Sequence, residues 1–410
     1  MRHRAAKPGR KMISAVMLFY FMAFAMLFLK DGDIRSALLA VLVPVLIVIG
    51  VNGIPRLFPA DRLLLSLTNF LCALGVLVLY RLSPERGLSQ ALNYLVGVAG
   101  MIFCTVFVRY GRAWRFYCAL MILGGIGFLA LPLLFGSEIN GAKNWVSFGP
   151  VAFQPSEMVK LALLCVIAFL LSRRKLVLAG AFAAICLGML MLQKDLGTAL
   201  LYYGVTLILM YLSTSSVPLA AIGLAGGAGA AVYGYHAFAH VRRRVAIWLD
   251  PWADPSGAGY QIVQGLIAMV NGGAWGVGLG LGNAQVIPAY YNDFIFSVIL
   301  HEFGCVFGLI VLGMYLAIVL RGFAIAGRSR GVFDALLATG CACLIGLQTF
   351  VIVAGNIKLI PLTGVTLPFI SYGGTSMVSS LCVIGLLQGV AAKAAAGVRE
   401  DKALAGWTEG

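Results

Sequence analysis

PAYYNDFIFSVILHEFG, residues 288–304, joins a polar loop to the start of a long apolar helix. Asp293 stands at that boundary, and the 27 residues that follow it carry only His301 and Glu302 as charged or imidazole side chains. A run of this length and composition spans a bilayer. A carboxylate beside hydrocarbon costs free energy unless it faces protein or water. An acid at such a position is therefore a candidate functional residue. Asp is also a common helix N-cap, so both interpretations of Asp293 stay open.

The composition indicates a polytopic membrane protein. Of the 410 residues, 61% are hydrophobic and 11% are charged, and the mean hydropathy is +0.96. Soluble domains carry about 25% charged residues, so a soluble core is excluded. The net charge of +15 is spread over helix ends and forms no single basic patch, so no nucleic-acid partner is expected.

Twelve apolar segments are long enough to cross a bilayer, which takes about 20 residues. They are 12–29, 36–53, 63–80, 88–108, 116–135, 156–172, 177–193, 196–212, 217–235, 294–320, 332–354 and 374–391. The sequence therefore predicts an all-α fold, a polytopic integral membrane helix bundle of about 12 transmembrane helices.

The distribution of basic residues predicts the orientation. With the N-terminus in the cytoplasm, 19 of the 30 Lys and Arg residues lie on the cytoplasmic side, as the positive-inside rule requires. An even number of spans places both termini there. Three longer segments then lie outside, namely 136–155, a large extracytoplasmic loop between residues 235 and 293, and 355–373.

The cysteines and histidines do not indicate a disulfide or metal framework. All nine Cys fall inside apolar runs, and the four His are scattered without acidic or thiol partners at ligand spacing. No metal ligands are predicted.

The first external segment contains Trp145 in a polar stretch and ends at a helix start marked by Pro155. Glu157 and Lys160 share one face of that helix at i and i+3. They are either a surface ion pair of small energetic value or a functional pair, which we favour because a Lys at this depth needs an anionic partner. Asp195, in the turn before a later helix, is adequately explained as a helix cap.

The other two external segments carry candidate ligand contacts. Arg242, Arg243 and Arg244 are either a solvated charge run or contacts for an anionic ligand, since Arg matches phosphate geometry. The stretch 260–269 reads as an interfacial or re-entrant helix, and the Gly-rich chain after it indicates a cavity, because irregular backbone at membrane depth needs protein or water around it. The hydroxyl-rich segment 363–376 lines a cavity or forms an ordinary capped turn.

Five motifs in one order resemble the FtsW/RodA/SpoVE family, also called SEDS proteins, between about residues 63 and 391. They are FQPSEMVK (153–160), KDLGTAL (194–200), LDPWADPSGAGYQ (249–261), NDFIFSVI (292–299) and LPFISYGGTS (367–376). The resemblance implies a ten-helix core at 63–391, preceded by a tail and two additional helices at 1–62 and followed by a cytoplasmic tail at 392–410.

The resemblance also implies a function. Family members polymerise glycan strands from lipid II at the outer face of the bacterial cytoplasmic membrane, release polyprenyl diphosphate, and work with a class B penicillin-binding protein. Asp293 matches the family's essential acid, and we expect it to be the general base. We expect the substrate to be bound by Trp145, Glu157, Lys160, Arg242, Arg243, Arg244 and Ser371.

The chain departs from the family pattern around Asp293. Tyr291 and Asn292 stand where His-Thr is usual, and the sequence His301, Glu302, Phe303, Gly304 replaces Glu-Glu-Leu-Gly. These departures keep the acid and change its neighbours.

Two other functions compete with polymerisation. A lipid II flippase would account for twelve spans and charges such as Lys160 and Glu302, and a noncatalytic scaffold of a cell-wall synthesis complex would tolerate loss of Asp293. A divalent cation such as Mg²⁺ or Mn²⁺ is left open, because no ligand cluster is visible in the sequence.

Overall fold

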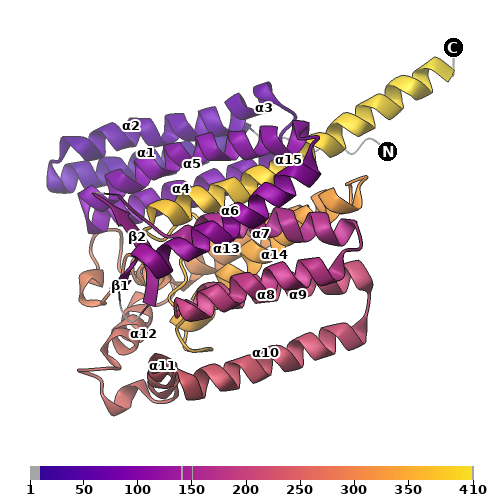
Figure 1. Ribbon diagram of the computed structural model, residues 1–410. Coiled ribbons are helices and arrows are strands. Elements are labelled where there is room, and N and C mark those ends of the chain that lie inside the picture. Colours follow the sequence, from indigo (N-terminus) through magenta and orange to yellow (C-terminus); the bar gives the residue numbers. More distant parts are fainter. Residues whose placement is uncertain (1–9, 140–141, 150, 409–410) are drawn as a thin grey trace.

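Long helices dominate the computed structural model, which describes residues 10–139, 142–149 and 151–408 (Figure 1). The long helices are α1 (Arg10–Asp31), α2 (Ile34–Val48), α4 (Arg62–Leu82), α5 (Pro84–Tyr110), α6 (Trp114–Phe135), α7 (Pro155–Ser172), α8 (Leu176–Leu192), α9 (Leu196–Thr214), α10 (Val217–Ala237), α13 (Ile295–Ala326), α14 (Val332–Asn356) and α15 (Gly374–Thr408). The shorter elements are a π-helical segment (Ile49–Gly53), α3 (Ile54–Leu57), β1 (Ser137–Ile139), β2 (Ala142–Phe148), β3 (Val151–Phe153), α11 (Ala239–Leu249), α12 (Tyr260–Gly272), and 3-10 turns at Pro251–Ala253 and Ala284–Val286.

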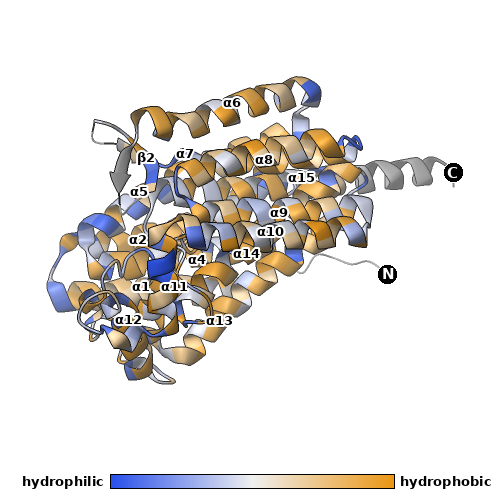
Figure 2. Cartoon of the chain, turned by 60° about the horizontal axis from the view of Figure 1, so that its bottom comes forward, coloured by the Kyte–Doolittle hydropathy of each residue, from blue (hydrophilic) through white to orange (hydrophobic). Residues whose placement is uncertain are grey.

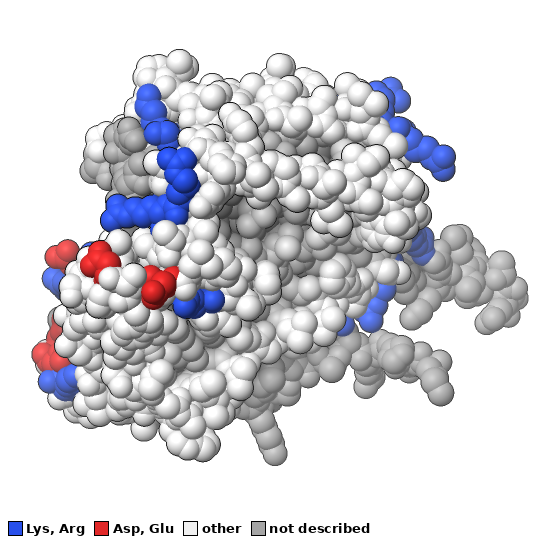
Figure 3. Space-filling view, turned by 90° about the horizontal axis from the view of Figure 1, so that it is seen from below, with Lys and Arg blue, Asp and Glu red and all other residues white. Residues whose placement is uncertain are grey.

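The predicted apolar segments coincide with the long helices, which confirms the all-α membrane bundle. Within the described residues, eleven helices are long and apolar enough to cross a membrane, and the 17-residue α8 accounts for the twelfth segment. Apolar residues cover the lengths of the helices (Figure 2), and on the face seen in Figure 3 the charged side chains gather at the two ends of the bundle with an uncharged belt between them. The chain is a multi-pass membrane protein.

The three segments predicted to share one side of the membrane do lie at one end of the bundle. Strands β1 and β2 and helices α11 and α12 gather there, while α15 extends beyond the other end (Figure 1). We call the first the loop end and the second the opposite end.

The first of these segments is a small antiparallel sheet, an element that the sequence analysis did not predict. Strand β2 lies between β1, with Ser137 opposite Trp145, and β3, with Val146 opposite Phe153. Gly149, at φ +60°, lies in the tight turn between β2 and β3. The strands are rich in aromatic and β-branched residues, which favour a pleated surface.

Close backbone approach holds the centre of the bundle together. Helices α14 and α15 each have 83% of their spans buried, whereas α10 has 6% and packs beside α9 at the edge. Gly385 and Gly389 of α15 lie against Met101 and Val108 of α5 with no room for a Cβ atom. In lipid the hydrophobic effect does not drive helices together, so their association depends on close van der Waals packing. Small residues at the crossing points make that packing possible.

Helix α15 is longer than predicted. The apolar segment was expected to end at residue 391, but the helix continues through Thr408. The stretch after residue 391 is rich in Ala, which has the strongest intrinsic helix propensity, so the helix does not end where the membrane-spanning segment does.

A broken turn interrupts α13 and binds the Gly-rich loop. Gly304 has φ +84°, and on either side of it the helical backbone bonds are replaced by bonds to the loop. The N–H groups of Val277 and Gly278 donate to the carbonyls of His301 and Glu302 at 3.0 Å, and Cys305 N–H donates to Gly273 O at 2.9 Å. The irregular backbone is thus satisfied by protein, as membrane burial demands.

The first two helices form a hairpin against α4 and α13. The Phe19 ring stacks on Phe307 of α13, with ring centroids 6.3 Å apart. At the loop end, Lys30 Nζ donates to Gly280 O at 2.6 Å and Tyr80 OH donates to Asp33 Oδ2 at 2.7 Å. This hairpin is therefore joined directly to the Gly-rich loop that leads to Asp293.

Candidate active site at the loop end

Asp293 lies two residues before α13, and its carboxylate does not cap that helix. The N-cap of α13 is Phe294, and no side chain makes a capping hydrogen bond there. The backbone around Asp293 is held by other segments: Asn356 Nδ2 donates to Asp293 O at 2.6 Å, and Ser371 Oγ donates to Asn292 O at 2.8 Å. The helix-cap interpretation is wrong, and the Asp293 carboxylate is not used in capping α13.

Arg244 is the cation that faces Asp293. Its Nη1 donates to Thr363 O at 2.9 Å, which places the guanidinium beside Gly364. A Cβ atom at Gly364 would lie 3.8 Å from Arg244 Nη2 and 4.0 Å from Asp293 Oδ2, so both side chains border the same space. Burial raises the pKa of Asp293 to about 6, and the positive charge of Arg244 opposes that rise. An acid with a pKa near neutrality suits proton transfer.

Arg242 and Arg243 do not join Arg244 at this point. Successive residues of a helix point about 100° apart, and Arg242 Nη1 turns back to His236 O at 2.6 Å. All three arginines are exposed on α11. The structure thus separates a group that the sequence analysis treated as one.

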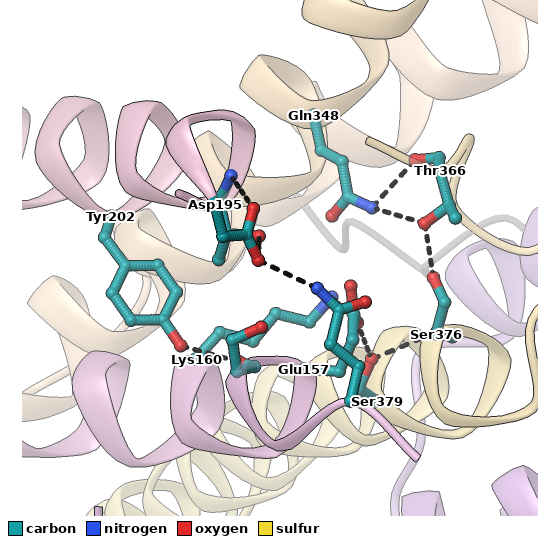
Figure 4. A network of polar contacts seen from close by, with 11 residues as sticks. Glu157, Lys160, Asp195, Tyr202, Gln348, Thr366, Ser376 and Ser379 are labelled. Carbon is teal, nitrogen blue, oxygen red and sulfur yellow. Dashed lines mark hydrogen bonds and ion pairs between the residues drawn. The ribbon is translucent and has the colours of Figure 1, made fainter. Parts of the chain in front are cut away.

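Glu157 and Lys160 form an ion pair, and it is buried. Glu157 Oε2 lies 2.5 Å from Lys160 Nζ, and the two side chains are only 11% and 4% exposed. Ser379 of α15 donates to the same carboxylate oxygen at 2.6 Å (Figure 4). One turn earlier on α15, Ser376 Oγ lies 2.5 Å from Thr366 Oγ1, which links α15 to the segment after α14. The surface ion pair considered from the sequence is wrong, since this pair links α7 to α15 and to the segment after α14.

Asp195 caps α9 as predicted and does more than that. Its Oδ1 accepts from the Thr198 N–H at 3.2 Å, while Oδ2 accepts from Asn144 at 3.0 Å and Gln154 at 2.9 Å. The carboxylate therefore ties the sheet and the start of α7 to α9.

Trp145 lies half-buried in β2, next to Asn144 and so close to the Asp195 cluster. Ser371 is buried, and its hydroxyl already donates to Asn292 O and accepts from Leu367 N–H at 2.8 Å. Ser371 thus holds the backbone of the residue before Asp293, whereas Trp145 lies in the sheet beside the residue that binds Asp195.

Arg86 is a neighbour of the site that the sequence analysis missed. Its guanidinium lies 3.8 Å over the ring of Tyr291, and its Nη1 donates to Tyr290 OH at 3.1 Å. Tyr291 also accepts at its carbonyl from Tyr372 N–H at 2.9 Å. Arg86 stands more than 200 residues from Asp293 in the sequence, so no local pattern could have joined them.

The described part of the chain holds no group of three or more His, Cys, Asp or Glu side chains placed to bind a metal ion. The described residues therefore fit no metal site of that kind.

Comparisons with known proteins agree on one family. A family model described as "Cell cycle protein", covering FtsW, RodA and SpoVE, matches residues 61–396. The protein named peptidoglycan glycosyltransferase RodA of Mycobacterium tuberculosis is 36% identical over 361 residues, covering 80% of this chain and 77% of that protein. A probable peptidoglycan glycosyltransferase FtsW of Geobacter sp. is 32% identical over 358 residues, covering 81% of this chain and 97% of that protein.

Two solved structures are also similar. A chain from a study of the structural coordination of polymerization and crosslinking by a peptidoglycan synthase complex has a TM-score of 0.69 at 28% identity, covering 82% of this chain and 98% of that one. Thermus thermophilus RodA, a rod shape determining protein, has a TM-score of 0.61 at 26% identity, covering 82% and 98%. In both cases nearly the whole of the other chain is matched.

Proposed function

The chain belongs to the FtsW/RodA/SpoVE family, and from that premise we propose that it is a peptidoglycan glycosyltransferase that polymerises lipid II with Asp293 as its general base. The observation that carries the role of Asp293 is its setting. It is a partly exposed carboxylate with a raised pKa, it caps no helix, and it borders the same space as a guanidinium.

The chemistry follows from these two charges. Asp293 accepts the proton of an acceptor-sugar hydroxyl, whose oxygen attacks the anomeric carbon of the lipid-linked sugar. The bond from that carbon to the diphosphate oxygen breaks, and polyprenyl diphosphate leaves with the electron pair. Arg244 is the group best placed to stabilise the negative charge that develops on the diphosphate, since preorganised charge is among the largest contributions to catalysis.

Lys160 has a different part in this proposal. Its ammonium is buried against Glu157, so it is already neutralised and is a poor partner for a second anion. The pair instead positions α7 against α15 and the segment 363–376, while Trp145 and Arg242 to Arg244 remain the proposed substrate contacts on the surface of the site.

The membrane setting supports a lipid-linked substrate. Helix α10 leads directly into α11, which carries Arg244, and its span is almost entirely unburied. A polyprenyl chain in the bilayer can therefore lie along α10 while its diphosphate reaches α11. By the positive-inside rule the loop end faces outward and both termini are cytoplasmic, in the cytoplasmic membrane of a bacterium.

A class B penicillin-binding protein is the proposed partner. Support comes from the similar chain in a solved peptidoglycan synthase complex that coordinates polymerization and crosslinking. A glycan polymerised at the loop end would be released on the side where a crosslinking enzyme acts.

The test is glycan-strand formation from purified lipid II by the full chain with its partner in detergent. Wild type should give long strands, and Asp293→Asn should lose about 10²- to 10⁴-fold in rate, the usual contribution of a general base. Asp31→Asn, an exposed acid at the same end, is the matched control and should polymerise normally.

Equal products from wild type and Asp293→Asn would remove Asp293 from catalysis and place activity in the partner, as the scaffold function requires. If neither folded preparation polymerised but lipid II crossed the membrane of a reconstituted vesicle, the flippase would replace the polymerase.

A further inference from the structure

A cavity of about 720 Å³ lies at the opposite end of the bundle, far from Asp293. It is bounded by the start of α6, the end of α7 and the start of α14. Helix α14 joins the two regions, because it begins with Val332 at this cavity and ends with Asn356, which holds the backbone of Asp293. At 1.5 Å per residue its 25 residues span roughly 36 Å, about the thickness of a bilayer.

Three arginines surround this cavity, which we call the arginine pocket. They are Arg112, Arg115 and Arg173, and no acidic residue is among the residues that line it. Asp334 is the closest acid along α14, and Lys393 Nζ already neutralises it at 3.0 Å. Within the described residues, none of the three arginines forms an ion pair with a carboxylate, and all three side chains are exposed, so they are open to an anion with several oxygens.

Aromatic side chains form the apolar wall of the arginine pocket. The rings of Trp114 and Phe333 lie 4.4 Å apart, and Phe169 packs edge-on against Phe333 at 6.1 Å. The Arg173 guanidinium lies 5.7 Å over Phe169. Aromatic and basic residues at the ends of apolar helices are typical of the depth at which lipid headgroups lie.

An apolar track leads away from the pocket along α6. Phe116 lines the pocket, and Leu120 and Leu123 follow it at i+4 and i+7, so the three share one face of the helix. They are 66%, 59% and 73% exposed. An acyl chain whose headgroup sat in the pocket would lie along this face.

From these features we propose that the arginine pocket binds an anionic phospholipid, with its phosphate among Arg112, Arg115 and Arg173 and an acyl chain along α6. Basic pockets between membrane helices are a known way of holding such headgroups, and the volume is within the usual range for a small-molecule site. Free phosphate shares the headgroup's chemistry, but it would make no use of the apolar track. The pocket is separate from the Asp293 site, so this binding does not depend on the proposed reaction.

Binding of short-chain phosphatidylglycerol to the purified full chain in neutral detergent tests the proposal, with phosphatidylcholine of the same chain length as the neutral lipid. Each arginine near a lipid phosphate contributes about five-fold in affinity. The variant Arg112→Gln/Arg115→Gln/Arg173→Gln should therefore bind phosphatidylglycerol about 100-fold more weakly if the three contributions multiply, and at least about ten-fold more weakly if two of the three contribute. The matched control Arg174→Gln/Lys175→Gln/Arg328→Gln removes the same charge from exposed residues of the same end that do not line the pocket, and it should bind within about two-fold of wild type.

Equal losses in the two triple variants, or no preference of wild type for phosphatidylglycerol, would overturn the proposal. Displacement of the lipid by millimolar inorganic phosphate would make this a free-phosphate site and would also overturn it. If the pocket variant does not fold, photocrosslinking of the wild-type protein tests the proposal instead. A photoreactive phosphatidylglycerol should crosslink to peptides from α6 near Phe116 and Leu120, and crosslinks spread evenly over all lipid-facing helices would contradict a specific site.

Discussion

At position 293 the effect of burial on a single carboxylate can be measured. The pKa of Asp293 is raised from 3.8 to about 6, chiefly by burial, with Arg244 opposing the rise. A general base acts only when it has lost its proton. We therefore expect the polymerisation rate to fall about ten-fold per pH unit below about pH 6 and to level off above pH 7. A rate that stays constant from pH 5 to pH 8 would rule out Asp293 as the titrating base.

The same pKa predicts how stability depends on pH. Since the folded state holds the proton more tightly than the unfolded state, the favourable contribution of Asp293 is fully present below about pH 4 and is lost as the pH rises through about 6. Asp293→Asn should therefore melt at a higher temperature than wild type at pH 8 and at the same temperature at pH 4. Thermal unfolding in detergent at both values checks this, with Asp31→Asn expected to follow wild type throughout.

A double-mutant cycle measures how strongly Glu157 and Lys160 stabilise each other in the folded protein. Glu157→Gln leaves a buried ammonium without its carboxylate, which should cost about 3–5 kcal/mol in the free energy of unfolding. Glu157→Gln/Lys160→Met removes both charges and should recover most of that loss. Unfolding of the two single variants and the double variant measures the coupling, and a single variant as stable as wild type would show that the pair is not energetically linked.

Among the elements, α13 depends most on one conformation. Gly304 has φ +84°, and a Cβ atom there would clash with the Ala274 carbonyl oxygen and the Gly276 N–H. Gly276, on the facing loop, has φ +81° and no space for a Cβ atom beside Glu302 O. The broken turn and the facing loop can therefore pack together only with glycine at positions 304 and 276. The loop leads directly to Asp293.

Gly304→Ala should accordingly lower the free energy of unfolding by roughly 2–5 kcal/mol, from backbone strain and overpacking together. Gly313→Ala is the matched control on the same helix, because a Cβ atom there meets nothing within 4 Å. It should be neutral or stabilise the helix by about 0.5–1 kcal/mol. Unfolding curves of both variants measure the two changes in the free energy of unfolding. Equal changes would show that the kink at Gly304 is not required for stability.

For the whole molecule, the distribution of charge predicts its orientation in the membrane. Ser256 is exposed at the loop end and Arg328 is exposed at the opposite end. In a Cys305→Ser background, which removes the one exposed native thiol among the nine, Ser256→Cys should react with a membrane-impermeant maleimide in intact cells. Arg328→Cys should react only after the cells are opened. The reverse pattern would invert the topology and place Asp293 in the cytoplasm.

The membrane-spanning helices could be predicted from the sequence because hydrocarbon leaves the backbone almost no alternative. With no water to satisfy its N–H and C=O groups, an apolar run of about 20 residues must be helical. The lone acid before residue 294 could be found for the same reason, since it stands out against a run with almost no charge. Short strands such as β2 escaped notice because they lie outside the bilayer, where the constraint does not hold.

Hydropathy and charge along the chain were enough to predict which segments cross the membrane, which ends of them carry the basic residues, and that Asp293 is the residue to examine. Which groups meet that acid depends on how the helices pack. Arg244 faces Asp293 while Arg242 turns to His236, and Arg86 reaches Tyr291 from across the bundle. The burial of the Glu157–Lys160 pair was decided in the same way, because Ser379 approaches from a helix more than 200 residues later. Such contacts depend on how helices pack and which way each side chain points, and neither hydropathy nor charge spacing along the chain carries that information.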